Sequence, residues 1–160
     1  MIGLLLSVVI FNIIAFKMNK RLTLTHIVQI WTFTIAVQML FDLIIEFKFH
    51  SYWYFGMGVD WEGLIPRTVL LPPVNLIFLN LYPFGKSVKI KIAFIICFVV
   101  AILMYELATL LPEPWGYFHY GWWKIWYSAL IDPILLCCLL GFYKWILWLE
   151  KKDRHKALPN

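Results

Sequence analysis

Five long apolar runs constrain this chain more than any other feature of its sequence. They cover residues 1–16, 22–47, 63–83, 90–112 and 124–149. A helix needs about 20 residues to cross a hydrocarbon layer of ~30 Å. The runs are apolar on all sides and lack the alternation of a transmembrane β-barrel, so helices are the expected solution. We predict an all-α integral membrane bundle of five transmembrane helices, forming a single domain over residues 1–149.

The composition excludes an ordinary soluble domain. Hydrophobic residues make up 62% of the chain and charged residues only 14%, against about 25% charged residues in soluble domains. The first run is short, but it has no basic residue before it and no small-residue cleavage pattern after it, so we interpret it as a retained helix. Pro66 and the pair Pro72-Pro73 predict a kinked or locally unwound third helix.

Basic residues gather on one side of the predicted bundle. Eleven of the fourteen fall in two connections and the carboxyl end: Lys17, Lys20, Arg21, Lys86, Lys89, Lys91, Lys144, Lys151, Lys152, Arg154 and Lys156. The positive-inside rule then places the N-terminus outside and the C-terminus in the cytoplasm, with residues 150–160 as a short basic tail. We expect a multi-pass protein of the cell membrane. Anionic lipid explains the net charge of +5 without a nucleic acid partner.

Four acidic residues lie inside the apolar runs: Asp42, Glu46, Glu106 and Asp132. A charge at the bilayer centre costs at least ~2.5 kcal/mol, so these side chains should face protein or water. Two stripes with a spacing of four residues contain three of them, namely Thr34, Gln38, Asp42 and Glu46 in the second run and Lys124, Ser128 and Asp132 in the fifth. Each stripe should lie on one helix face and lead to the outer surface.

Arg67 begins the third run on the same side. We expect it to be held by one or more of Asp42, Glu106 and Asp132. One interpretation is an internal clamp that joins apolar helices. The other is an outward-facing polar pocket for an ion, a proton or a small ligand, because carboxylates outnumber Arg67. The candidate cluster comprises Asp42, Glu46, Arg67, Glu106, Ser128 and Asp132.

The two predicted outer loops hold six of the nine Trp residues. An interfacial aromatic belt explains this enrichment. The alternative is an aromatic lid over the polar cluster, suited to a ring-bearing, sugar-like or cationic ligand. A plain belt should decorate both interfaces, and the inner side has fewer aromatic residues. The lid candidates are Trp53, Trp61, Trp115, Trp123 and Tyr127.

Other chemistry has little support in the sequence. His50 and His119 fall in the outer loops with Asp60, Glu62 and Glu113, but no His or Cys spacing indicates a metal site. We predict no metal and no cofactor. Free cysteines in apolar runs behave as small hydrophobic residues, and acylation of Cys137 or Cys138 is a minor alternative. The chain also lacks a phosphate-binding loop, a nucleophile elbow and a detectable repeat.

Several blocks of the chain resemble a known pattern. They are "FKMNKRL", "GVDWEGLIPR", "NLIFLNLYPF", "MYELATL" and "GWWKIWYSALIDPIL", in this order along nearly the whole chain. Together they resemble a family of small five-helix hypothetical membrane proteins from spore-forming Gram-positive bacteria. The resemblance implies the same five-helix topology, and it transfers no functional residue.

Two functional hypotheses follow from these features. The first is a non-enzymatic binding, sensing or complex-forming component of the membrane, which contacts lipid and recognises a small ligand or a protein partner at its outer face. Small size and the lack of a reactive nucleophile favour it. The alternative is an intramembrane enzyme acting on a lipid-like or polyene substrate, with Glu106 or Asp132 as a general acid.

Overall fold

The computed structural model describes residues 1–58 and 61–157, which contain five α-helices and two short strands. Along the chain these are α1 (Ile2–Lys17), α2 (Leu24–Asp42), η1 (Leu43–Lys48), β1 (Tyr52–Tyr54), η2 (Pro66–Leu70), α3 (Leu71–Leu81), α4 (Val88–Thr109), β2 (Phe118–Tyr120) and α5 (Ile125–Ala157). The segments η1 and η2 are π-helical; η1 continues α2, and η2 leads into α3.

Among the described residues, three helices are long and apolar enough to cross a membrane: Leu24–Lys48, Val88–Thr109 and Ile125–His155. Helix α1 is also apolar but has only 16 residues. Large hydrophobic side chains such as Leu5, Val28 and Leu130 are exposed on the outside of these helices. An apolar exterior of this extent suits lipid as the surrounding solvent.

The helices agree with the expected ranges except in two places. The proline-rich third run stays helical, and its irregularity is the π-helical winding of η2. Pro66 begins η2, and Pro72-Pro73 fall in the first turn of α3, directly after η2. Helix α5 continues past residue 149 to Ala157, so the described part of the basic tail is helical. Residues 158–160 of that tail lie outside the described residues.

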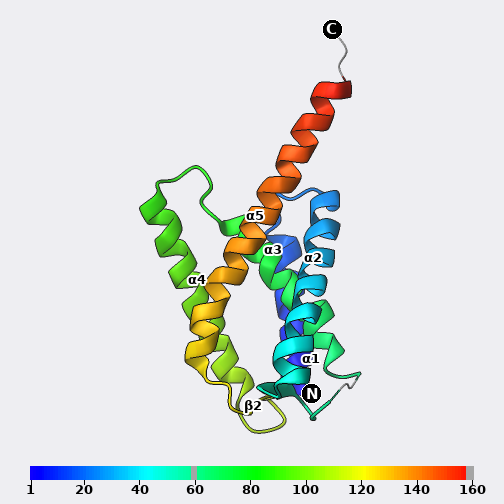
Figure 1. Cartoon of the computed structure of the whole chain (residues 1–160), viewed down its shortest axis with the longest axis vertical. Coiled ribbons are helices and arrows are strands. Elements are labelled where there is room, and N and C mark those ends of the chain that lie inside the picture. Colours follow the sequence, from blue (N-terminus) through cyan, green and yellow to red (C-terminus); the bar gives the residue numbers. More distant parts are fainter. Residues whose placement is uncertain (59–60, 158–160) are drawn as a thin grey trace.

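The helices run alternately up and down, and the two termini lie at opposite ends of the molecule (Figure 1). The two strands lie at the end that holds the N-terminus, which we call the strand end. The α1–α2 and α3–α4 connections lie at the other end, which we call the tail end because α5 projects from it. Helix α3 packs against α1 and α2, whereas α4 packs mainly against α5.

Thr23 and Ser87 mark the starts of α2 and α4, the two helices that follow the connections at the tail end. Thr23 precedes α2, and its hydroxyl accepts a hydrogen bond from the His26 backbone N–H, forming a capping box with the His26 ring. Ser87 occupies the N-cap of α4. Both residue types favour N-cap positions, because their extended backbone and short polar side chains suit a helix start.

Two apolar clusters form the core. One lies between the helices and contains Ile30, Phe78 and Leu139. The other lies at the strand end, where Leu4 and Leu70 pack with aromatic residues of the strands and of the segment before α5. Gly3 brings α1 close to this end: a Cβ at this position would lie 1.9 Å from the Trp115 carbonyl oxygen. The start of α1 therefore contacts the α4–β2 connection without space for a side chain.

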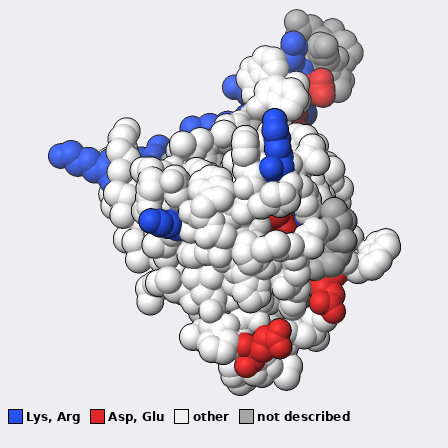
Figure 2. Space-filling view, turned by 60° about the horizontal axis from the view of Figure 1, so that its bottom comes forward, with Lys and Arg blue, Asp and Glu red and all other residues white. Residues whose placement is uncertain are grey.

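Strands β1 and β2 pair in antiparallel fashion and close the strand end. Tyr52 pairs with Tyr120, Trp53 with His119, and Tyr54 with Phe118. The charges differ between the two ends of the molecule. On the face shown in Figure 2, most of the visible Lys and Arg residues lie toward the tail end, and most of the exposed carboxylates outside the tail lie toward the strand end.

Candidate functional site

Arg67 is the centre of a buried ionic group that joins η2 to the α2–η1 helix. Its Nε donates to Asp42 Oδ2 at 2.6 Å, and its Nη2 donates to Glu46 Oε2. Its Nη1 donates to the Gly63 carbonyl at 2.5 Å. The exposed fractions of the three charged residues are 2% or less for Arg67 and Asp42 and 3% for Glu46. We call Asp42, Glu46 and Arg67 the arginine clamp.

Neutral donors complete the clamp. Asp42 Oδ1 accepts from the Tyr52 hydroxyl at 2.5 Å and from Gln38 Nε2 at 2.8 Å. The Arg67 guanidinium carbon lies 4.6 Å from the centroid of the Tyr54 ring. Asp42 was among the expected partners of Arg67, and Glu46 takes the place of Glu106 and Asp132. These last two residues belong to a separate polar group.

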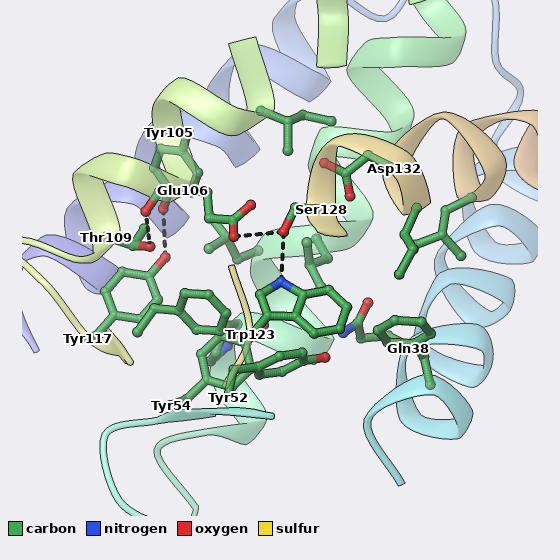
Figure 3. A pocket seen from close by; sticks show the side chains of 18 residues that line it. Gln38, Tyr52, Tyr54, Tyr105, Glu106, Thr109, Tyr117, Trp123, Ser128 and Asp132 are labelled. Atoms are coloured by element: carbon green, nitrogen blue, oxygen red, sulfur yellow. Dashed lines mark hydrogen bonds between the residues drawn. The ribbon is translucent and has the colours of Figure 1, made fainter. Parts of the chain in front are cut away.

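Glu106 of α4 is the centre of this second group. Its Oε1 accepts from Ser128 Oγ at 2.8 Å and from the Tyr120 hydroxyl, and Ser128 Oγ accepts from Trp123 Nε1 at 2.9 Å. Two of these contacts are drawn in Figure 3. The group connects α4, β2 and α5, and each donor in it is uncharged.

Asp132 lies one turn further along α5 from Ser128. Its Oδ2 atom is buried and has no hydrogen-bond partner among residues 1–58 and 61–157. A buried carboxylate oxygen without a partner is costly, and in native proteins such an atom calls for an explanation. The Asp132 side chain faces the space into which Glu106 and Ser128 also point (Figure 3).

That space is a cavity of about 160 Å³, which we call the polar compartment. Polar side chains from three helices line it, namely Gln38, Glu106, Thr109, Ser128 and Asp132. Aromatic residues of β1, β2 and the neighbouring loops cover it at the strand end: Tyr52, Tyr54, Tyr117, Phe118 and Trp123.

A larger cavity of about 330 Å³ adjoins the polar compartment toward the middle of the bundle. Gln38, Tyr105 and Asp132 line both cavities, so the two meet at these residues. The larger one is lined mostly by apolar side chains, which come from all five helices. We call it the apolar compartment.

The aromatic cover differs from the expected lid. Trp123 lines the polar compartment, and Tyr127 packs against it with ring centroids 5.2 Å apart. Trp53 instead stacks on His119. Trp61 and Trp115 are 86% and 55% exposed, and neither lines the polar compartment or the apolar compartment. Tyrosines 52, 54 and 117 take the positions that the sequence analysis gave to tryptophans.

The tyrosines of this cover are strongly perturbed. Burial, together with the neighbouring Asp42 carboxylate, raises the pKa of Tyr52 well above its usual value. Burial also raises the pKa of Tyr117, which shares a 2.7 Å hydrogen bond with Tyr105. These phenols therefore stay protonated at physiological pH, and the Tyr52 hydroxyl donates a hydrogen bond to Asp42.

The remaining candidates do not form a site in the described part of the chain. No three His, Cys, Asp or Glu side chains within residues 1–58 and 61–157 lie close enough together to hold a metal ion. Asp60, one of the acids weighed for such a site, lies outside the described residues. Cys97, Cys137 and Cys138 are free and exposed on the helices.

Comparison with protein-family models, curated proteins and solved structures finds no match to this chain. The resemblance to small five-helix membrane proteins of spore-forming Gram-positive bacteria therefore stays a prediction.

Proposed function

We propose that the chain is a five-span protein of the cell membrane whose polar compartment, open toward the outside, binds a small ligand. It acts as a binding, sensing or complex-forming component and not primarily as a catalyst. The observation that carries the proposal is the buried Oδ2 of Asp132, which lies beside a cavity and has no partner among the residues that the structure describes. A ligand that donates a hydrogen bond to this oxygen would remove its desolvation cost.

The proposed topology has support at both ends of the bundle. The basic connections and the tail lie at the end from which α5 projects, and the aromatic cover lies at the other end. The positive-inside rule assigns the tail end to the cytoplasm and the strand end to the outside. The compartment below the strands would then receive its ligand from the outer side or from the outer leaflet.

The contacts within the polar cluster support a different role for each of its two parts. The arginine clamp saturates its own charges, with Arg67 bound to two carboxylates and a carbonyl. This arrangement supports a structural role for Asp42, Glu46 and Arg67. Glu106 and Asp132 face the cavity without a basic partner among its lining residues, which supports a ligand-binding role for them.

The substitution Asp132→Asn tests the proposal, because it keeps the volume of the side chain and removes its charge. We expect the variant to be as stable as the wild type in detergent. Small molecules extracted from the two purified proteins are then compared by mass spectrometry. A compound present at about one per chain in the wild type should fall at least fivefold in the variant.

Asp153→Asn is the matched control, since Asp153 is exposed near the end of α5. It should retain the compound. Unfolding of Asp132→Asn would show that this carboxylate is structural and would contradict the proposal. So would a folded Asp132→Asn protein that keeps the same bound compounds as the wild type.

One observation favours the enzyme as a second candidate. Glu106 and Asp132 both line the polar compartment, an arrangement in which one carboxylic acid can donate a proton while the other stays ionised. A lipid-like substrate would then change in mass when incubated with purified protein, and Glu106→Gln should stop the change. A bound lipid that stays unchanged over hours would support the binding component instead.

A further inference from the structure

We propose that the ligand is a single-chain amphiphile whose protonated amine lies in the polar compartment and whose hydrocarbon chain occupies the apolar compartment. This inference rests on the proposed ligand-binding function and names the chemical class of its ligand. It depends on three properties of the two cavities: their connection, the charge of the smaller one and the lining of the larger one.

The two compartments meet at residues that belong to both. Gln38, Tyr105 and Asp132 stand at the junction, with apolar neighbours from η2, α3, α4 and α5. Volumes of about 160 and 330 Å³ together fall in the range of small-molecule sites, roughly 300–1,000 Å³. A ligand that fills both must therefore be polar at one end and apolar over the larger part of its length.

The polar compartment favours a cationic head. Glu106 and Asp132 line it, and no Lys or Arg of the described part of the chain is among its lining residues. The nearby Arg67 is bound within the arginine clamp and does not neutralise them. The aromatic side chains of Tyr52, Tyr54 and Trp123 also line the space, and aromatic rings attract a desolvated cation. An ammonium group donates up to three hydrogen bonds, and Asp132 Oδ2 is a free acceptor within the described chain.

The lining of the apolar compartment is suited to a hydrocarbon chain. Thr34 and Asn75 are two of its few polar lining residues, and they bind each other. Asn75 Nδ2 donates to Thr34 Oγ1 at 2.9 Å, and Thr34 Oγ1 donates to the Ile30 carbonyl at 2.8 Å. Thr34 and Asn75 are therefore hydrogen-bonded within the protein and do not require a polar group of the ligand. Leucine, isoleucine, valine and phenylalanine side chains make up most of the remaining wall.

The test uses the full chain in maltoside micelles and measures dissociation constants by native mass spectrometry. The probes are dodecylamine, butylamine, dodecan-1-ol and dodecanoate. Dodecylamine should bind one per chain, at least tenfold more tightly than butylamine because its longer chain buries more methylene groups. It should also bind at least tenfold more tightly than dodecan-1-ol and dodecanoate, which lack a positive charge.

Ala101→Phe obstructs the apolar compartment from α4, because Ala101 lines that compartment and not the polar one. It should reduce the preference for dodecylamine over butylamine at least tenfold. Ala93→Phe is the matched control, since Ala93 is exposed on the same helix and lines neither cavity. Val74→Phe obstructs the same compartment from α3 and replaces Ala101→Phe if that variant fails to fold.

Equal binding of dodecylamine by the wild type and by both obstructed variants would overturn the placement of the chain. Equal or tighter binding of dodecanoate would overturn the amine head. Neither result would affect the proposed function if Asp132→Asn still loses the compound that co-purifies with the wild type. The two proposals can therefore fail separately.

Discussion

Arg67 shows how a full charge is tolerated inside an apolar bundle. Its guanidinium group reaches two carboxylates and one carbonyl while its stem stays buried in η2. Removing one partner from such a group is costly, because the remaining charges lose their compensation without returning to water. The free energy of unfolding should therefore fall more when one member of the clamp is removed than when all three members are neutralised.

Arg67→Met is expected to reduce the free energy of unfolding by about 3–5 kcal/mol, because Asp42 and Glu46 are left buried and unpaired. Unfolding by SDS in mixed micelles measures the change. The triple variant Arg67→Met, Asp42→Asn, Glu46→Gln should recover part of the loss, since no uncompensated charge remains. Lys124→Met is the control, because Lys124 is exposed at the same end of the molecule. Equal stability of Arg67→Met and Lys124→Met would contradict a clamp.

The sequence predicts part of this residue-scale arrangement. The pairing of Arg67 with Asp42 follows from the cost of an isolated charge in the membrane and from the few acids within reach. Glu46 shares the four-residue stripe of Asp42, so spacing alone was compatible with its role as second partner, whereas no hydropathy pattern indicates the π-helical winding of residues 43–48. The unpartnered oxygen of Asp132 is likewise a property of the packed structure and cannot be read from residue spacing.

The Tyr52 hydroxyl should make the stability of the protein depend on pH in the alkaline range. Burial and Asp42 raise the pKa of Tyr52 above the value of about 10 expected for an unfolded chain. The folded state therefore holds this proton more tightly than the unfolded state. Its contribution to stability is complete below about pH 10 and is lost as pH rises toward the raised pKa.

The comparison of wild type with Tyr52→Phe measures this effect. At pH 8 the variant should be less stable by about 1.5–3 kcal/mol, because the hydrogen bond to the Asp42 carboxylate is absent. Between pH 9 and about pH 11 the wild type should lose more stability than the variant, as phenylalanine has no proton to release. Lysine titration affects both proteins and cancels. Parallel pH profiles would contradict the argument.

At the scale of elements, the strand pair determines which aromatic residues cover the cavity. Successive side chains in a strand point to opposite faces. Tyr52 and Tyr54 therefore face the cavity, and Trp53 between them stacks on His119, its partner across the pair. The alternation in "YWY" was available in the sequence, but two three-residue strands separated by more than sixty residues give too little local signal to predict their pairing. The helices were predictable because their apolar runs are long.

Glu106 connects three elements, which yields a prediction for local opening. Its carboxylate accepts from Ser128 of α5 and from Tyr120 of β2. Glu106→Ala should leave these hydroxyls without their acceptor and increase amide hydrogen exchange in β2 and in the first turns of α5. Exchange in α1 and α2 should stay at the wild-type level. Glu113→Ala, an exposed acid in the α4–β2 connection, should change neither region. Uniform exchange changes in both variants would argue against a specific link.

Across the molecule, the distribution of basic residues agrees with the end at which the connections between helices lie. Eleven of fourteen basic residues belong to segments that the sequence analysis places on one side, and the connections that carry them lie at the tail end of the structure (Figure 1). The apolar compartment could not be predicted from charge and connectivity. Its walls come from all five helices, and α4, which forms one of them, packs mainly against α5.

The proposed orientation predicts which positions react from outside the cell. Single cysteines are introduced at exposed positions of a chain whose native cysteines are replaced by alanine. Met57→Cys and Glu113→Cys lie at the strand end, and Lys86→Cys and Lys152→Cys lie at the tail end. A membrane-impermeant maleimide should label the first pair in intact bacterial cells. It should label the second pair only after permeabilisation, because the basic segments are held on the cytoplasmic side.

The pattern of labelling distinguishes an inverted protein from one with a different number of membrane crossings. Permeabilised cells should label all four positions, which controls for expression and thiol reactivity. Labelling of Lys86→Cys and Lys152→Cys alone in intact cells would mean that the protein is inverted and that the polar compartment opens toward the cytoplasm. Different labelling of Lys86→Cys and Lys152→Cys would mean that an odd number of crossings separates the two, and the five-span arrangement would be wrong. Protection of the second pair alone places the compartment where a ligand from outside can reach Asp132.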